Sequence, residues 1–206
     1  MKSCIHFIRH GITEGNVKKW YYGKTDLPLA EEGRKLLKTL TDEGRYPDPE
    51  FADLYTSGLL RTEETFEIIY GEIEHKTITN LQEMNFGEFE CKSYEELKAL
   101  EGFITWADDQ SGEVAFPGGD SKKSFIKRVS LGLKELLSYH KLREDAHRDN
   151  GKDAVSIVVC HGGVISQIMM ELFASENKNL WDWIPDPGHG YTVYFEESNP
   201  IKYEKI

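Results

Sequence analysis

The sequence predicts an α/β protein, a three-layer α/β/α sandwich with a mostly parallel central sheet. Short apolar runs with strand character recur along the chain, and segments with helical spacing lie between them. This alternation is typical of a parallel sheet that is covered by helices on both faces. A chain of 206 residues can bury such a sheet in one unit, so we expect residues 1–206 to form a single domain.

Each element is predicted from the spacing of its apolar residues. Four segments in which apolar residues alternate or run together are predicted strands: residues 3–9, 52–57, 154–160 and 191–195. Three segments in which they recur every three or four positions are predicted helices: residues 36–40, 60–70 and 125–140. The charged stretch from His140 to Asp153 is expected to be a solvated helix end and loop.

Residues 80–120 are rich in Glu, Gly and aromatic side chains, with short helical segments at 93–100 and 103–109. We expect this part of the chain to be an insertion that covers the active edge of the sheet.

Composition excludes several classes of protein. No apolar run approaches the ~18–20 residues that span a bilayer, and the N-terminus passes directly into a predicted strand. We therefore expect a cytoplasmic protein. The net charge of −11 argues against binding to nucleic acid or to an anionic membrane. Cys4, Cys91 and Cys160 are widely spaced, so they predict buried thiols rather than disulfides or a zinc site.

Two predicted strands end in a histidine followed by glycine. Arg9-His10-Gly11 closes the first, and His161-Gly162-Gly163 closes the strand at 154–160. The carboxyl ends of parallel strands meet at one edge of an α/β sheet, where such folds bind ligands. Arg61 and Glu83 follow other predicted elements, and the combined set of imidazoles, guanidiniums and a carboxylate suits phosphoryl transfer.

Each of these residues also has an ordinary structural interpretation. A strand-end histidine is more often hydrogen-bonded than catalytic, Arg61 could be an ion-paired helix residue, and Asn16 could cap a helix. Ligand type alone would also allow a metal site at His10, His161 and Glu83. The paired arginines would repel a metal ion, so we expect neither a metal nor a cofactor.

Five segments in order resemble the histidine phosphatase superfamily, the phosphoglycerate-mutase-like group. They are Arg9–Asn16, Thr56–Thr65, Leu81–Glu90, Pro117–Ser121 and Val159–Gly163. The resemblance covers nearly the whole chain. It implies that His10 is a nucleophile that is transiently phosphorylated, as suits an imidazole that is neutral near pH 7.

The resemblance also implies roles for the other residues. Arg9 and Arg61 would hold the phosphoryl oxygens, His161 would donate to them, and Asn16 would be a neutral contact. Glu83 would protonate the leaving group and later activate water. Glu88 and Glu90 are rival carboxylates, for which we favour a solvated loop. In addition, Gly162 would let the backbone approach the phosphate, and Gly23 would lie with Trp20, Tyr21 and Tyr22 at the pocket mouth.

The sequence departs from the common family pattern at Ile12, at Gly15, where an aromatic residue is frequent, and at Phe89–Cys91. None of these changes removes a phosphate ligand, but they leave the substrate of the pocket undetermined. Phe103 and Trp106 could lie above it. Aromatic side chains there suit a nucleoside-like or sugar substrate as well as a simple core.

We therefore predict a metal-independent phosphomonoesterase of the histidine acid phosphatase type, a monomer or homodimer, that acts on a small phosphorylated metabolite. Alternatives are a cofactor-dependent phosphoglycerate mutase, an α-ribazole-5′-phosphate phosphatase and a non-catalytic phospholigand-binding module. The short distance in sequence from Glu83 to His161 favours hydrolysis over the mutase, and the presence of both His10 and Glu83 argues against the binding module.

Overall fold

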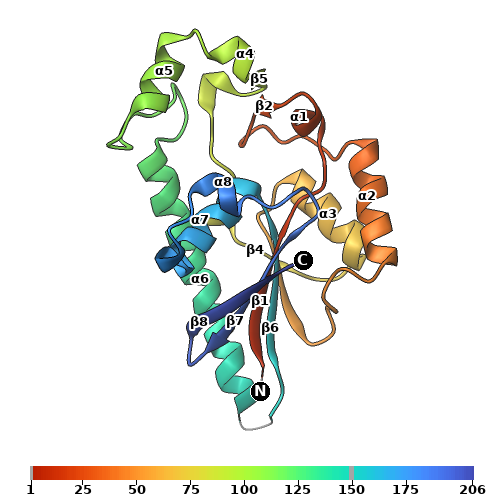
Figure 1. The fold of residues 1–206 in the computed structure, drawn as a ribbon. Helices are drawn as coiled ribbons and strands as arrows, with labels where there is room; N and C mark the ends of the chain where they lie inside the picture. The colour runs from red at the N-terminus through yellow and green to blue at the C-terminus, as the bar shows by residue number, and fades with distance from the viewer. Residues whose placement is uncertain (1, 149–150) are drawn as a thin grey trace.

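The computed structural model describes residues 2–148 and 151–206, which are built around a six-stranded sheet (Figure 1). In spatial order its strands are β4 (Lys76–Thr77), β3 (Ala52–Thr56), β6 (Ala154–Cys160), β1 (Ser3–Arg9), β7 (Gly190–Glu196) and β8 (Asn199–Lys205). The first four are parallel to one another, and β7 pairs antiparallel with both β1 and β8. The predicted mostly parallel sheet is confirmed, with one antiparallel edge hairpin that the sequence did not reveal.

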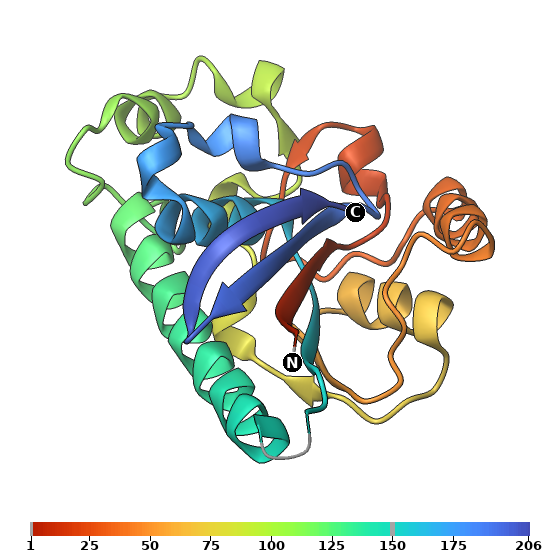
Figure 2. The same cartoon turned by 60° about the horizontal axis from the view of Figure 1, so that its bottom comes forward.

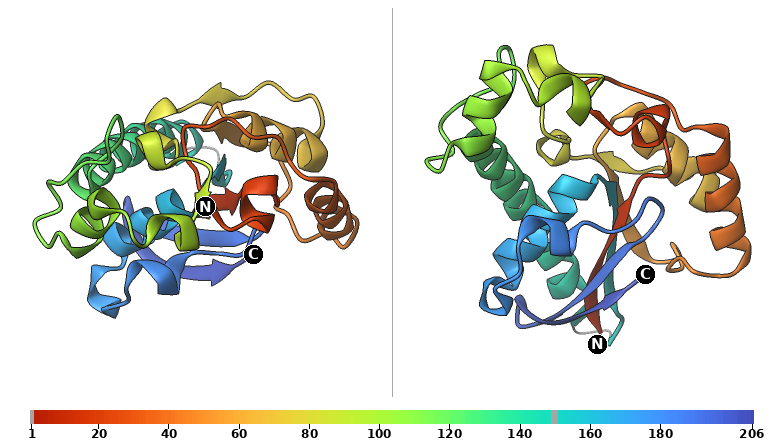
Figure 3. Two further views of the ribbon diagram at one scale, coloured as in Figure 1. Left: turned by 90° about the horizontal axis from the view of Figure 1, so that it is seen from above. Right: turned by 45° about the horizontal axis from the view of Figure 1, so that its top comes forward.

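Helices cover both faces of the sheet, as Figure 2 and Figure 3 show. On one face, α2 (Glu31–Asp42) and α3 (Leu60–Tyr70) bury Leu37, Phe66 and Ile69 in a cluster with apolar residues of β1, β3 and β6. This burial removes the amphipathic stripes of both helices from water, which supplies most of a helix's stability in a folded protein.

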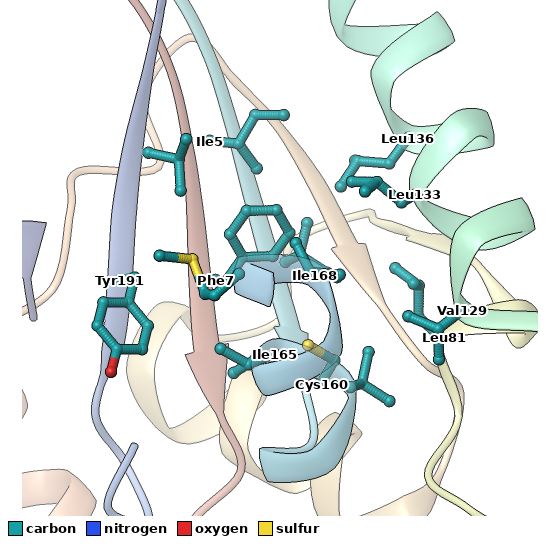
Figure 4. Close-up of a cluster of buried hydrophobic side chains, with 14 of the residues drawn as sticks. Ile5, Phe7, Leu81, Val129, Leu133, Leu136, Cys160, Ile165, Ile168 and Tyr191 are labelled. Carbon is teal, nitrogen blue, oxygen red and sulfur yellow. The ribbon is translucent and has the colours of Figure 1, made fainter. Parts of the chain in front are cut away.

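The opposite face carries α6 (Lys122–Arg148) and α7 (Gly162–Leu172). Figure 4 shows the core between them and the sheet, where Val129, Leu133 and Leu136 of α6 lie near Phe7 of β1 and Ile168 of α7. All five side chains are almost completely buried. The predicted apolar stripe at 125–140 is therefore the core face of α6.

The expectation for residues 140–153 is partly wrong, because α6 continues to Arg148. His140 and Glu144 lie one turn apart and are buried against β1, where Ser3 Oγ donates to Glu144 Oε1 (2.6 Å) and lies 2.9 Å from His140 Nε2. Polar composition alone did not reveal this buried network. Residues 149 and 150 lie outside the described residues.

The remaining elements are short, and most of them lie at the top of the molecule in Figure 1. They are α1 (Glu14–Val17), the β2–β5 pair (Trp20–Tyr21 and Lys92–Ser93), α4 (Tyr94–Leu97), α5 (Glu101–Asp108), α8 (Leu180–Trp183) and 3₁₀ turns at Thr79–Leu81, Gly87–Phe89 and Ala174–Glu176. No helix in the described ranges is long and apolar enough to cross a membrane. Cys4 and Cys160 are buried thiols as predicted, whereas Cys91 is only half-buried.

The topology explains where a ligand can bind. After β1 the chain continues to α2 on one face of the sheet, and after the neighbouring β6 it continues to α7 on the other face. Connections that diverge in this way leave a crevice beyond the carboxyl ends of the two strands. His10 and His161 are the residues that follow these two ends.

Candidate active site

The two strand-end histidines face each other at this switch point. Arg9 is opposite Cys160 in the parallel register, so the next residues, His10 and His161, leave the sheet side by side. Their ring centroids are 5.3 Å apart with an edge-to-face orientation. Both side chains are almost completely buried, at 3% and 0% exposed.

His10 has a defined tautomer and an available ring nitrogen. Its Nδ1 lies 2.7 Å from the carbonyl oxygen of Gly11, which can only accept, so Nδ1 carries the proton. Nε2 keeps its lone pair and has no hydrogen-bond partner within the described chain. Burial lowers the pKa of His10 well below its ordinary value, and the charges of Arg61 and Arg9 lower it further. The ring is therefore held neutral, as a nucleophile requires.

His161 is engaged on both sides of its ring. Its Nε2 lies 2.7 Å from Ser57 Oγ, and Arg61 Nε donates to its Nδ1 at 3.3 Å. Burial and the nearby Arg61 hold its pKa well below its ordinary value. In this arrangement neither nitrogen is free to donate to a phosphoryl oxygen, so the predicted donor role requires a change of tautomer or a proton received on Nδ1.

The two guanidiniums are positioned by backbone carbonyls. Arg61 is fully buried and donates to the carbonyls of Gly23 (2.8 Å) and Thr25 (3.2 Å), and Arg9 donates to the carbonyl of Pro185 (2.7 Å). Neither forms an ion pair with a carboxylate in the described part of the chain. Burial lowers the pKa of both groups, and the charge of Glu83 opposes that shift. Two buried cations without a counterion make a site for an anion.

Arg9 adds a second indication that the site binds an anion. Its Nε is buried and has no hydrogen-bond partner among the described residues. Such a group costs free energy unless something accepts from it. Gly162 packs against this side chain, since a Cβ there would lie 3.1 Å from Arg9 Cζ and Nε.

Glu90 corrects one expectation. It is half-buried, and its carboxylate accepts from the backbone N–H groups of Gly23, Lys24, Thr25 and Phe86 at 2.9–3.1 Å. A carboxylate with four backbone donors is a fixed structural anchor rather than part of a solvated loop. Glu88, by contrast, is exposed as expected.

Gly23 therefore acts differently from the prediction. It does not line the pocket, and its carbonyl holds Arg61 from behind. A Cβ at this position would lie 1.6 Å from the carbonyl oxygen of Met84, so only glycine lets these two chain segments touch.

Glu83 lines the pocket beside the start of α7. Its Oε1 accepts from the backbone N–H of Met84 and its Oε2 from that of Gly163, both at 2.9 Å. Gly163 is at the N-terminus of α7, where the helix dipole favours a negative charge. Each oxygen keeps a second lone pair, so the carboxylate can still receive a proton or orient a water. A Cβ on Gly163 would come within 2.6 Å of Oε1.

Asn16 and Tyr22 form the opposite wall. Asn16 lines the pocket, and its Oδ1 accepts from the Thr13 N–H (3.0 Å) and from the Tyr22 hydroxyl (3.1 Å), which leaves Nδ2 as its available donor. A Cβ on Gly15 would lie 2.5 Å from the Tyr22 ring. Tyr22 thus occupies the space that an aromatic residue at position 15 would need.

One cavity of about 700 Å³ joins these groups. Of the predicted site residues, Arg9, His10, Asn16, Arg61, Glu83 and Gly162 line it, while His161 and Gly23 lie directly behind. Most of the remaining wall is apolar or aromatic, including Trp20, Phe86, Trp106, Ile126, Met170 and Trp181. Phe103 is instead buried beside Tyr21 and Trp106. Sequence spacing missed the walls that α6, α7 and α8 contribute.

Metal binding has no support in the arrangement of ligands. Within the described ranges, no group of three or more His, Cys, Asp or Glu side chains is placed to hold an ion.

A buried pair of imidazoles and two uncompensated guanidiniums at the switch point of an α/β sheet define a protein built to bind a phosphoryl group. A family model for the histidine phosphatase superfamily (branch 1) matches residues 5–202. The chain belongs to this superfamily, and its members are enzymes that act on phosphorylated small molecules.

Similar proteins within the superfamily are named after two different activities, a phosphatase and a mutase. An adenosylcobalamin/alpha-ribazole phosphatase of Salmonella typhimurium is 27% identical over 89% of this chain and 86% of its own. A 2,3-bisphosphoglycerate-dependent phosphoglycerate mutase of Brucella ovis is 25% identical over 84% of this chain and 82% of its own. The crystal structure of the alpha-ribazole phosphatase from Shigella flexneri superposes with a TM-score of 0.78 at 24% identity, covering 96% and 93% of the two chains.

Proposed function

We propose that this protein is a phosphomonoester hydrolase that works through a phosphohistidine at His10. The observation that carries the proposal is the His10 ring itself. Its Nδ1 proton is committed to the Gly11 carbonyl, and its unprotonated Nε2 belongs to a pocket wall that also carries two guanidiniums without a counterion. This is the arrangement that an in-line attack on a phosphoryl group needs.

The reaction has two steps. In the first, His10 Nε2 forms a bond to phosphorus as the bond to the leaving oxygen breaks, and Glu83 delivers a proton to that oxygen. In the second, Glu83 removes a proton from water, which attacks phosphorus and breaks the N–P bond, releasing inorganic phosphate. Arg9 and Arg61 stabilise the charge on the non-bridging oxygens in both steps, and no metal is needed.

The low pKa of His10 supports the acid-phosphatase type of activity, because the nucleophile stays unprotonated below pH 6.5.

The pocket supports a substrate with a bulky, largely apolar alcohol. Its volume of about 700 Å³ exceeds the needs of a glycerate, and its wall beyond the phosphate site is mainly aromatic and aliphatic. The names of two relatives make α-ribazole-5′-phosphate the narrower candidate. The same wall also carries the polar side chains Lys19, Lys122 and Gln167, so the preference for hydrolysis over the mutase rests on the short distance in sequence from Glu83 to His161.

Rapid quenching of the enzyme with labelled phosphomonoester tests the nucleophile. Label recovered at high pH on His10 is the expected result, with no label in His10→Gln. Label on another residue, or substantial turnover by His10→Gln, would refute the mechanism.

The role of Glu83 is tested by comparing leaving groups. Glu83→Gln should be slow with alkyl phosphates, whose alkoxide needs a proton, but should transfer phosphoryl normally from p-nitrophenyl phosphate. It should then accumulate phosphohistidine and show a burst. An equal loss on both substrates without a burst would reassign the acid, and Glu88 would be tested next.

A further inference from the structure

We infer that Arg128, a residue of α6 that does not line the pocket, positions the Glu83 carboxylate for proton transfer. The inference rests on the proposed function, because it requires Glu83 to exchange protons with the substrate and with water. Arg128 is a positioning residue, since it acts through the chain that carries Glu83 and not on the reacting atoms.

Arg128 binds the segment around Glu83 through several carbonyls. Its Nη1 donates to the carbonyl of Gln82 at 2.6 Å and to that of Asn80 at 3.3 Å. Its Nη2 donates to the carbonyl of Glu83 itself at 3.1 Å. One guanidinium thus fixes the backbone on which the proposed acid is mounted, and α6 anchors it to the core of the protein.

Asp120 completes the support from the other side. Its Oδ2 accepts from Arg128 Nη2 at 2.9 Å and from the backbone N–H of Asn85 at 3.0 Å. The backbone N–H of Asp120 donates in turn to the carbonyl of Asn85 at 2.8 Å. The chain is therefore held both before and after Glu83.

Other bonds hold the ends of this segment, where Gln82 Nε2 donates to the Ser57 carbonyl and the Phe86 N–H donates to Glu90, but among the described residues Arg128 alone donates to the Glu83 carbonyl. Residues 82–86 connect two 3₁₀ turns and belong to no helix or strand. The Glu83 side chain accepts only from Met84 and Gly163 in the described chain, so its place follows from its backbone. A displacement of ~1 Å can cost ~10²-fold in rate when a catalytic group must meet a reacting atom. A lysine cannot reproduce the forked contacts of a guanidinium.

Arg143 provides a matched control on the same helix. It also joins α6 to a carboxylate and a carbonyl, those of Asp53 and Phe51, and it is similarly shielded from solvent. Its contacts lie at β3 and not beside Glu83. Loss of Arg143 therefore reports the general effect of removing a helix-to-sheet contact.

The experiment compares Arg128→Gln, Arg128→Lys and Arg143→Gln on an alkyl phosphate and on p-nitrophenyl phosphate. We expect both Arg128 variants to lose ~10–10²-fold in kcat on the alkyl phosphate. The rate of phosphoryl transfer from p-nitrophenyl phosphate should change only a few-fold, with KM little altered. Arg143→Gln should affect both substrates equally, and melting temperatures identify any variant that is merely unstable.

A double variant separates the possible failures. Glu83→Gln combined with Arg128→Lys should be no slower on the alkyl phosphate than Glu83→Gln alone, because the support has nothing left to position. Additive losses, or equal losses on both substrates, would overturn the role of Arg128. If Glu83→Gln itself shows no dependence on the leaving group, the proposed role of Glu83 fails first. If Arg128→Gln does not fold, Arg128→Lys gives the same comparison.

Discussion

The phosphate-binding end of the cavity and the apolar pocket beside it are built from different kinds of structure. The first combines residues at the ends of β1 and β6 with Arg61 of α3, and His10, His161 and Arg61 are at most 3% exposed. The second is made by loops, by residues of α6 and α7 and by short helices such as α8, and its rim includes Trp181, which is 75% exposed. Strand ends and buried backbone carbonyls thus fix the histidines and guanidiniums, while more exposed elements shape the rest of the cavity.

This difference suggests that the charged end of the cavity carries out the chemistry and that its apolar wall selects the substrate. Groups held by a sheet and by backbone carbonyls can be positioned closely enough to stabilise a transition state. A pocket wall made by loops and by exposed helix residues can change in sequence without disturbing those groups. Relatives named as phosphatases and as mutases share this fold at 24–27% identity, as such a division of tasks would allow.

The largest effect should come from the nucleophile. His10→Gln should reduce turnover by ~10⁴-fold or more, as removal of a nucleophile does in other enzymes that form covalent intermediates. His6→Gln is the matched control, because His6 is also on β1 but its ring contacts Thr192 and does not line the pocket. Comparable activity of His10→Gln and His6→Gln in a phosphate-release assay would show that the histidine at the strand end is not needed for the chemistry.

Arg61→Ala should follow, with a loss of ~10²–10³-fold in kcat, because in the proposed mechanism Arg61 stabilises charge that develops in the transition state. Arg61→Lys should recover only part of it, since one ammonium cannot reach the same partners. Arg34→Ala, which breaks an ion pair between α2 and α3, serves as a control for stability. Full activity of Arg61→Ala would make Arg61 a purely structural residue.

A smaller and more selective effect is expected at the pocket rim. Trp181→Ala should raise KM for a bulky ester such as naphthyl phosphate by up to ~10-fold, which corresponds to ~1.4 kcal/mol of lost apolar contact. Inhibition by inorganic phosphate should be unchanged, because Trp181 is an exposed apolar residue of α8 and offers no charge to an anion. An equal change in both quantities would mean that the two regions are not independent.

The smallest effect concerns protonation. NMR of the imidazoles should show His10 and His161 still neutral at pH 6.5, where an unperturbed histidine is half protonated. Because the unfolded chain binds protons there and the folded one does not, the free energy of unfolding should fall as pH drops below ~6.5. His10→Gln should weaken this dependence without abolishing it, since burial also lowers the pKa of His6, to about 4, and of His140.

The sequence by itself determined the sheet, its main strands and the residues at their ends. Apolar runs such as 154–160 specify buried strands, and a histidine after each of two parallel strands must reach the same edge. The motifs around Arg61 and Glu83 are also visible in the sequence. Local pattern was sufficient here because these features depend on strand direction and adjacency.

Tertiary structure alone decided what each polar side chain contacts. The sequence pattern predicts a solvated loop for Glu90 and indicates no role for Arg128, yet both side chains bind backbone groups of distant segments. It placed His140 at a solvated helix end, where the structure buries it against β1. Backbone donors and acceptors carry no sequence signature, because every residue has them, so their partners become visible only when the chain is folded.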